Sequence, residues 1–272
     1  MSGRPLDSGP GFSWRPFARD VASPCRGRPG RRGRNHGLTR GAPRSWDVIG
    51  GPGSWLYQLF DRQRQGLNRR LARYLASRTG VGRGSLVLEA GSGPGSGSSA
   101  LAGEPWRCAS IALDLDADAL REARRRDPNL LLVRGDLQRL PFADEAMDLV
   151  WSSSTIEHLP DPDAAVGEMR RVAKPEGYVF LGVPSATGPL GFQRWIAGTP
   201  FGVWIGTVFT ATRLRALAGR AGLACIDLRA YYSRCFLGAL CRRAGTPQSS
   251  APDVAFQPAN RLTSKRVSSE QI

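Results

Sequence analysis

Residues 85–101, SLVLEAGSGPGSGSSAL, decide the fold. A short apolar run meets an acid, Glu89, and four glycines then follow within seven positions. A glycine-rich turn between a strand and a helix lets a ligand approach the backbone closely. In an open parallel sheet such a ligand lies outside the carboxyl ends of the strands. The stretch therefore predicts a binding site at the end of a first strand.

Further apolar runs follow this first one along the chain, and segments with a helical pattern separate most of them. They are CASIALDL (108–115), LLLVRGD (130–136), MDLVWSSS (147–154), YVFLGVPS (178–185), ACIDLRAYY (224–232) and CFLGALC (235–241). Unbroken apolar runs that alternate with helices indicate a parallel sheet covered on both faces. We predict one doubly wound α/β domain over residues 47–245.

Three segments have clear helical patterns. Residues 55–79 place leucines at three- and four-residue spacings, with an arginine-rich outer face and Gly80 at the end. Residues 161–172 combine a capping Asp161 with Pro162, and an inner stripe of Ala165, Val166, Met169 and Val172. The motif KPEG (174–177) is expected to stop this helix, and residues 210–222 form the last one.

The two ends of the chain have a different composition. Residues 1–46 hold eight glycines, six prolines and ten arginines against two aspartates, and so carry +8 of the formal net charge of +15. Such a segment buries too little apolar surface to offset its chain entropy, and we predict that it is disordered. Residues 246–272 give the same prediction.

The basic charge raises the question of a nucleic-acid or membrane partner. Only Lys174 and Lys265 are lysines, a skew towards arginine that favours a compositional bias over a selected binding surface. No apolar run approaches the ~20 residues that span a bilayer, and the five cysteines have no C-x-x-C spacing. These features favour a cytoplasmic protein with reduced thiols and no metal cluster. A peripheral membrane contact stays open.

Acidic residues follow the second and third runs. Asp114 stands at the carboxyl edge, where an acid can accept both hydroxyls of a ribose. Asp136 lies at the same edge, where it could accept from an adenine amino group while the Leu137 backbone N–H donates to a ring nitrogen. Gly95-x-Gly97-x-x-Ala100 also satisfies a dinucleotide-binding pattern, although its register begins four residues late.

Five segments in this order resemble the class I S-adenosylmethionine-dependent methyltransferases, and among them the type 11 group. The segments are LEAGSGPG (88–95), ALDLD (112–116), GDLQRLPF (135–142), DLVWSSSTIEHLPDP (148–162) and KPEGYVFLGVP (174–184). The resemblance covers about residues 55–240. It implies a Rossmann-like sheet of seven strands with the last strand antiparallel. It also implies S-adenosyl-L-methionine as the cofactor.

The resemblance assigns cofactor-binding residues by position. The methionine part would lie over a loop whose residues are Glu89, Gly91, Ser92, Gly93 and Gly95, with Glu89 ordering the loop and helping to hold the amino group. The adenosine part would be bound by Asp114, Leu115, Asp136 and Leu137. Ser152 and Ser153 would lie beside the reactive methyl group.

A catalytic base is the next question, because a hydroxyl acceptor must lose a proton. His158 is the only histidine in the predicted domain, it follows the fourth run, and its ordinary pKa suits a general base. The alternative is that Glu157 and His158 brace a turn. A related group of quinone-ring O-methyltransferases has a second glutamate where this chain has Ser154, so we predict no metal.

An aromatic segment over about residues 186–210 is the candidate acceptor lid. Trp195, Trp204 and Phe209 would line it, which implies a flat or apolar small molecule. The alternative is a covering helix whose aromatic residues fill the core. Within the predicted domain (47–245), neither the run N/D-P-P-Y/F nor a Pro-Cys pair, both typical of nucleic-acid methylation, occurs.

We therefore predict methyl transfer from S-adenosyl-L-methionine to a small apolar or aromatic acceptor. Three alternatives stay open: a non-catalytic cofactor-binding or regulatory protein tethered by the basic arm, a nucleic-acid methyltransferase, and a nicotinamide-dependent oxidoreductase. The sequence does not predict the acceptor, the methylated atom or the oligomeric state.

Overall fold

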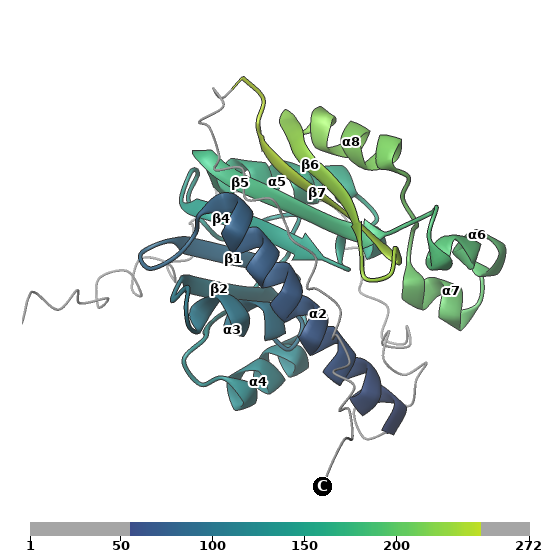
Figure 1. Cartoon of the computed structure of the whole chain (residues 1–272), viewed down its shortest axis with the longest axis horizontal. Coiled ribbons are helices and arrows are strands. Elements are labelled where there is room, and N and C mark those ends of the chain that lie inside the picture. Colours follow the sequence, from purple (N-terminus) through teal and green to yellow (C-terminus); the bar gives the residue numbers. More distant parts are fainter. Residues whose placement is uncertain (1–54, 246–272) are drawn as a thin grey trace, which may run out of the picture.

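Seven strands form one mixed sheet in the computed structural model, which describes residues 55–245 (Figure 1). The strand order is β3-β2-β1-β4-β5-β7-β6. The strands are β1 (Leu86–Ala90), β2 (Ala109–Asp114), β3 (Leu131–Arg134), β4 (Met147–Ser153), β5 (Ala173–Pro184), β6 (Leu223–Tyr231) and β7 (Phe236–Arg243). Strands β1 to β5 pair in parallel, and β7 is antiparallel to both β5 and β6. The predicted fold class is confirmed. The arm at 1–46 and the tail at 246–272 lie outside the described residues.

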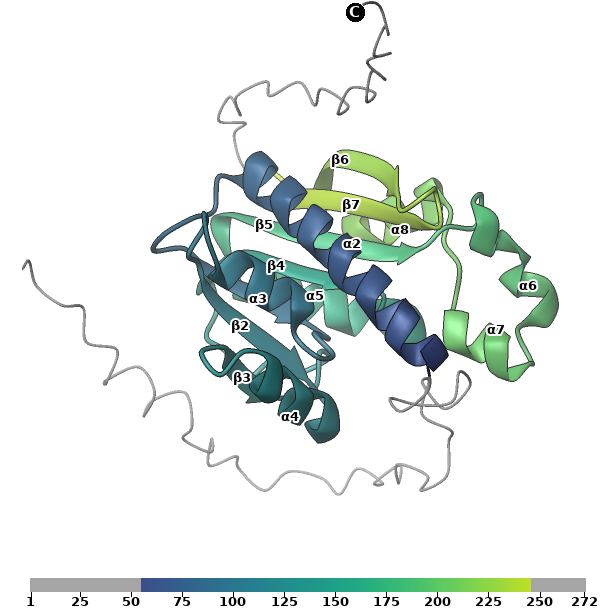
Figure 2. The ribbon, with the colours of Figure 1, turned by 60° about the horizontal axis from the view of Figure 1, so that its bottom comes forward.

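Helices cover both faces of this sheet (Figure 2). One face carries α2 (Trp55–Thr79), α3 (Ser96–Ala102) and α4 (Ala117–Arg126), and the other carries α5 (Pro162–Val172) and α8 (Ala211–Arg220). Helix α2 crosses its face diagonally towards the carboxyl edge of the strands. Gly80 follows α2 at a φ of 70°, as expected for a helix that ends in a left-handed glycine.

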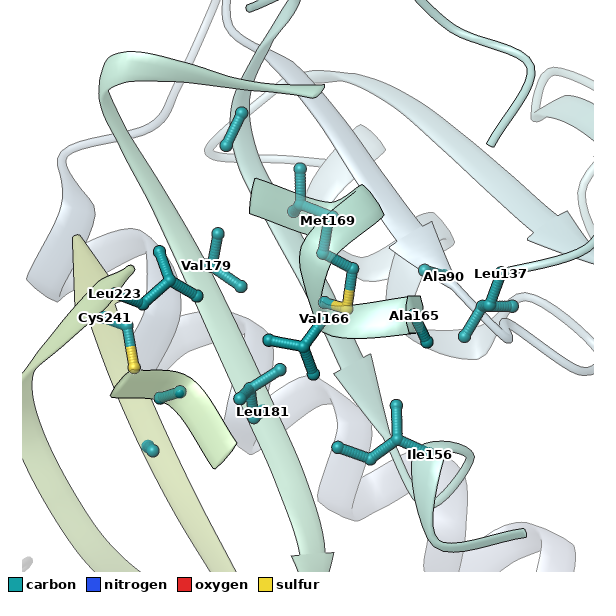
Figure 3. Close-up of a cluster of buried hydrophobic side chains, with 14 of the residues drawn as sticks. Ala90, Leu137, Ile156, Ala165, Val166, Met169, Val179, Leu181, Leu223 and Cys241 are labelled. Atoms are coloured by element: carbon teal, nitrogen blue, oxygen red, sulfur yellow. The ribbon is translucent and has the colours of Figure 1, made fainter. Parts of the chain in front are cut away.

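Helix α5 shows how the sequence pattern becomes packing. The Asp161 side chain accepts from the Ala164 N–H, and Pro162 occupies the first turn. The predicted inner stripe is buried against β4 and β5, and Figure 3 shows Val166 and Met169 beside Val179 and Leu181. Burial of each such side chain contributes about 1.5–3 kcal/mol. The residues that were predicted to face the core do so: Ala165, Val166, Met169 and Val172.

The start of β5 differs from the prediction. Helix α5 ends at Val172, just before KPEG (174–177), as predicted. These four residues nevertheless belong to β5, which already pairs with β4 at Ala173. The pairing register shifts between Met147 and Leu149. A side chain on Gly177 would lie 2.9 Å from the Met147 carbonyl oxygen, so glycine is required where this irregular entry crosses β4.

Beyond the carboxyl edge of the sheet, η3 (Pro189–Phe192), α6 (Gln193–Ile196) and α7 (Pro200–Ile205) form a projecting unit (Figure 1). A parallel bridge between Ser185 and Phe209 joins the two ends of this unit. The short helix η2 (Ile156–His158) lies between β4 and α5. None of the helices in the described part of the chain has the length and apolar character needed to cross a membrane.

Candidate active site

The glycine loop after β1 is anchored to β2. Gly91, Gly93 and Gly95 have φ values of 80°, 52° and 71°, in the region that glycine adopts without strain. The N–H groups of Gly91 and Ser92 both donate to the Leu113 carbonyl oxygen, at 2.8 and 2.9 Å. The Gly93 N–H donates to Asp114 Oδ2 at 2.7 Å. The loop is therefore held open by the strand beside it.

Asp114 joins this loop to the start of α4. Its second oxygen, Oδ1, accepts from the Asp116 N–H at 2.9 Å. A carboxylate oxygen can accept more than one hydrogen bond, so both oxygens keep capacity for a ligand's hydroxyl groups. Leu115 follows with half of its side chain exposed, 50%. The pair presents a fixed acceptor beside an apolar surface.

The same hydrogen bonds bear on which ligands the loop suits. A phosphate cradle needs several backbone N–H groups that point at the ligand. Here the N–H groups of residues 91, 92 and 93 already donate to protein acceptors, and one of these acceptors is a carboxylate. A pyrophosphate would meet negative charge at this position. The arrangement favours a cationic or hydroxyl-bearing ligand.

Glu89, near the end of β1, lies beneath the first turn of α3. It is 3% exposed, and its Oε2 accepts from both the N–H and the hydroxyl of Ser98 at 2.6 Å. Burial raises the pKa of Glu89 to about 7, although the Ser98 hydrogen bonds and the charge of Arg64 oppose the rise. Glu89 therefore positions the first turn of α3. Its expected contact with the cofactor's amino group stays a prediction.

Asp136 and Leu137 lie at the same edge of the sheet, after β3. Asp136 is exposed, and its Oδ1 accepts from the Gln138 N–H at 2.9 Å. The Leu137 side chain is buried, at 5% exposure. The Gly135 N–H donates to the backbone oxygen of Asp114 at 3.1 Å, which joins the two acidic turns. Their role towards an adenine stays a prediction.

The end of β4 completes the edge. Ser152 is fully buried, and Ser153 Oγ lies 3.0 Å from the hydroxyl of Tyr231, at the end of β6. Burial raises the pKa of Tyr231, so its hydroxyl stays protonated. The Thr155 hydroxyl donates to the Gly91 carbonyl oxygen at 3.1 Å. Tyr231 and Thr155 were not predicted as site residues.

Glu157 and His158 follow on η2, under the projecting unit. The Glu157 carboxyl is buried, and its Oε2 has no hydrogen-bond partner among the described residues. Burial raises the pKa of Glu157 to about 8, while partial burial lowers the pKa of His158. A side chain on Gly206 would lie 2.8 Å from both residues, and the Thr207 N–H donates to the Glu157 backbone oxygen. Both residues therefore pack against the turn after α7, and the role of His158 as a general base stays a prediction.

Comparison with known proteins connects this geometry to a family. Residues 88–181 match the family model described as "Methyltransferase domain". The chain contains a methyltransferase domain. The seven-stranded, Rossmann-like sheet is the fold that the resemblance to the class I S-adenosylmethionine-dependent methyltransferases implies.

Two curated relatives resemble the methyltransferase domain at similar identity. A malonyl-(acyl-carrier protein) O-methyltransferase from Pseudescherichia vulneris is 35% identical over 144 residues, which are 52% of this chain and 55% of that protein. A demethylmenaquinone methyltransferase from Renibacterium salmoninarum is 35% identical over 119 residues, 43% of this chain and 48% of that protein. The chain thus spans about half the length of the curated relatives it matches.

A solved structure supports the fold of the methyltransferase domain. Magnesium protoporphyrin IX methyltransferase from Synechocystis PCC 6803, solved with bound SAH, superposes with a TM-score of 0.58. It is 18% identical and covers 74% of this chain and 93% of that one. At this identity the likeness concerns the fold alone.

The three aromatic residues expected to line the acceptor site of the methyltransferase domain differ in their surroundings. Phe209 is 2% exposed and belongs to the core, as the alternative interpretation of the lid expects. Trp195 is 75% exposed and lies under the guanidinium of Arg194, 4.6 Å from its ring centre. The side chain of Trp204 lies outside the described residues.

The buried Glu157 predicts a pH-dependent stability. Its raised pKa means that the native protein keeps a proton that the unfolded chain loses near pH 4.5. Stability should therefore fall as pH rises from about 4.5 to about 8, and the lost free energy should be about 5 kcal/mol. Glu157→Gln cannot ionise, so at pH 8.5 we expect it to be more stable than the wild type by about this amount.

Denaturant unfolding at a series of pH values measures this difference. Glu176→Gln is the matched control, because it makes the same replacement at an exposed position. A Glu157→Gln difference from the wild type that does not change with pH would contradict the buried, protonated carboxyl.

Proposed function

We propose that this protein transfers a methyl group from S-adenosylmethionine to a small acceptor with an apolar or aromatic part. The observation that carries the proposal is the carboxylate of Asp114, which is bonded to the Gly93 N–H at 2.7 Å and lies where a phosphate-binding loop would present free N–H groups. A ribose that donates two hydroxyl groups suits this acceptor, and a pyrophosphate does not. The methyltransferase-domain match over residues 88–181 supports the same cofactor.

The residues of the chain would have separate tasks. Asp114 accepts from the ribose, Glu89 holds α3 through Ser98, and Tyr231 fixes Ser153 at the end of β4. The cofactor supplies an electrophilic methyl group, so the chemistry of the group itself is the cofactor's. The protein then contributes alignment and the exclusion of water, and such positioning is worth about 7–11 kcal/mol of the barrier.

The acceptor class is supported by the projecting unit η3–α6–α7. Its exposed apolar side chains are Phe192 at 38%, Trp195 at 75% and Val203 at 62%. Such side chains close to the carboxyl edge of a sheet suit an apolar molecule or a loosely apposed membrane surface. The curated relatives with similar sequences act, by their names, on malonyl-(acyl-carrier protein) and on demethylmenaquinone.

Mass spectrometry tests transfer directly. An extract of the source cells is incubated with the protein and a cofactor whose methyl group is deuterated. We expect one or more small apolar products that carry the deuterated methyl group, and none with the Asp114→Ala variant. Cofactor binding without any labelled product would instead favour a regulatory protein that binds S-adenosylmethionine but does not turn over.

A further inference from the structure

Arg64 differs in position from its neighbours on α2. The helix buries Leu71, Ala72 and Leu75, which follow Arg64 by 7, 8 and 11 residues and therefore lie on the same helical face. Arg64 is half-buried, whereas Arg70 is exposed. The arginine-rich outer face predicted for this helix thus does not include Arg64. A charged side chain on the buried face of a helix needs a reason.

Its guanidinium group lies against the glycine loop. Nη1 and Nη2 are 3.7 and 3.9 Å from the position that a Cβ atom on Gly93 would occupy. Gly93 is the residue whose N–H is bonded to Asp114. This part of α2 is also held from the other side, because the Tyr232 hydroxyl donates to Gln63 Oε1 at 3.1 Å. The helix therefore carries Arg64 to the loop that would lie beneath the methionine part of the cofactor.

Arg64 brings a positive charge to a loop that has two carboxyl groups, Glu89 and Asp114, beside it. Burial raises the pKa of Glu89 and the charge of Asp114 adds to the rise, while the charge of Arg64 opposes it. Arg64 is thus close enough to act electrostatically on the floor of the loop. The amino-acid part of S-adenosylmethionine is a zwitterion: carboxylates suit its ammonium group, and its own carboxylate needs a cation. A guanidinium group binds a carboxylate through two parallel N–H···O bonds.

We propose that Arg64 binds the carboxylate of the cofactor's methionine part, so that α2 forms one wall of the cofactor site. The inference rests on the proposed function, since it presupposes a cofactor with a free amino-acid group. It names a residue outside the five segments that resemble the family, on a helix that the family model over residues 88–181 does not reach.

Two ligands that differ only in the carboxylate test the assignment. S-adenosylhomocysteine carries it, and decarboxylated S-adenosylhomocysteine keeps the ammonium, the thioether and the adenosine. In calorimetric titration, Arg64→Ala should weaken S-adenosylhomocysteine binding about 10- to 100-fold and change the affinity for the decarboxylated ligand by less than about twofold. Arg64→Lys should be intermediate, since an ammonium group cannot form the paired bonds. Arg70→Ala is the control and should bind both ligands as the wild type does.

Three other results would overturn the assignment of Arg64 as the residue that binds the carboxylate. Equal losses for both ligands would mean that Arg64 supports the loop without contacting a carboxylate. Unchanged affinity for S-adenosylhomocysteine in Arg64→Ala would remove the role altogether. If the wild type itself binds neither ligand, the cofactor assignment fails, and the inference fails with it. These results are distinguishable because the wild-type titration is read first.

Discussion

Asp114→Ala is expected to abolish the increase in melting temperature that S-adenosylhomocysteine or S-adenosylmethionine causes in the wild type. The variant loses the acceptor for a ribose and also the anchor of the Gly93 N–H, so the loop loses its support from β2. Hydrogen bonds to a charged group contribute about 1.5–3 kcal/mol each, and the loss of two lowers affinity at least about 100-fold. At a ligand concentration of about 100 times Kd, the wild type should gain about 5–10 °C.

Asp116→Ala is the matched control for this measurement. Asp116 lies two residues further along the same turn and caps α4 by accepting from the Asp118 N–H at 2.8 Å. Its replacement should lower the melting temperature of the free protein, since a lost cap costs about 1 kcal/mol, yet keep the ligand-induced shift. An Asp114→Ala variant that still shifts would refute the ribose assignment. An increase in melting temperature with NADH, and none with S-adenosylhomocysteine, would instead favour a nicotinamide-dependent oxidoreductase that uses the dinucleotide-binding pattern at Gly95.

The strands could be predicted because a strand that is buried on both faces appears in the sequence as a short apolar run. A strand that is covered by helices on both faces of the sheet has no polar face. The run YVFLGVP (178–184) on the parallel side of β5 and the run CFLGALC (235–241) on the antiparallel β7 are therefore apolar throughout. Helix α5 likewise shows its capping residue and its buried stripe in the sequence. The start of β5 was missed because proline and glycine in KPEG (174–177) are typical of helix ends. The helix does end just before them, but the same residues also form the irregular start of β5.

The site was predictable only where a residue's role follows from its place on a strand. Asp114 ends β2 and meets the glycine loop, as expected. The contacts that join the loops to one another connect residues far apart in sequence: Thr155 with Gly91, Ser153 with Tyr231, and Arg64 with Gly93. No local pattern encodes such pairs. Arg64 did leave one signal, since it lies in line with the apolar stripe of α2.

The four glycines in residues 85–101 have two different roles, which their regular spacing does not show. Gly91, Gly93 and Gly95 have positive φ values and shape the turn. Gly97 has ordinary helical geometry within α3 and is needed for a different reason, the close approach of this helix to β4. The formal dinucleotide pattern that begins at Gly95 therefore arises from a turn glycine and a packing glycine, which have no common ligand.

Gly97→Ala is accordingly expected to be among the most damaging single-methyl additions in the domain. The added Cβ would overlap the indole of Trp151, with Cζ2 at 2.5 Å, and would lie 2.6 Å from Glu89 Oε1. Trp151 is fully buried and has no room to retreat. Overpacking of this kind costs about 3 kcal/mol, which corresponds to a melting temperature lower by about 6–12 °C.

A glycine-to-alanine substitution at an open helical position should instead raise the stability of the protein. This contrast identifies the contact with Trp151 as the cause of the loss at Gly97. Gly167 in α5 and Gly219 in α8 have nothing within 4 Å of an added Cβ, and replacing either with alanine should stabilise the protein by up to about 1 kcal/mol. Trp151→Phe removes the two indole atoms closest to the added methyl group. We therefore expect the double variant Gly97→Ala/Trp151→Phe to lose less stability than the two single changes together. Additive losses, measured by denaturant unfolding, would mean that Gly97 is required for backbone freedom and not for the contact between α3 and β4.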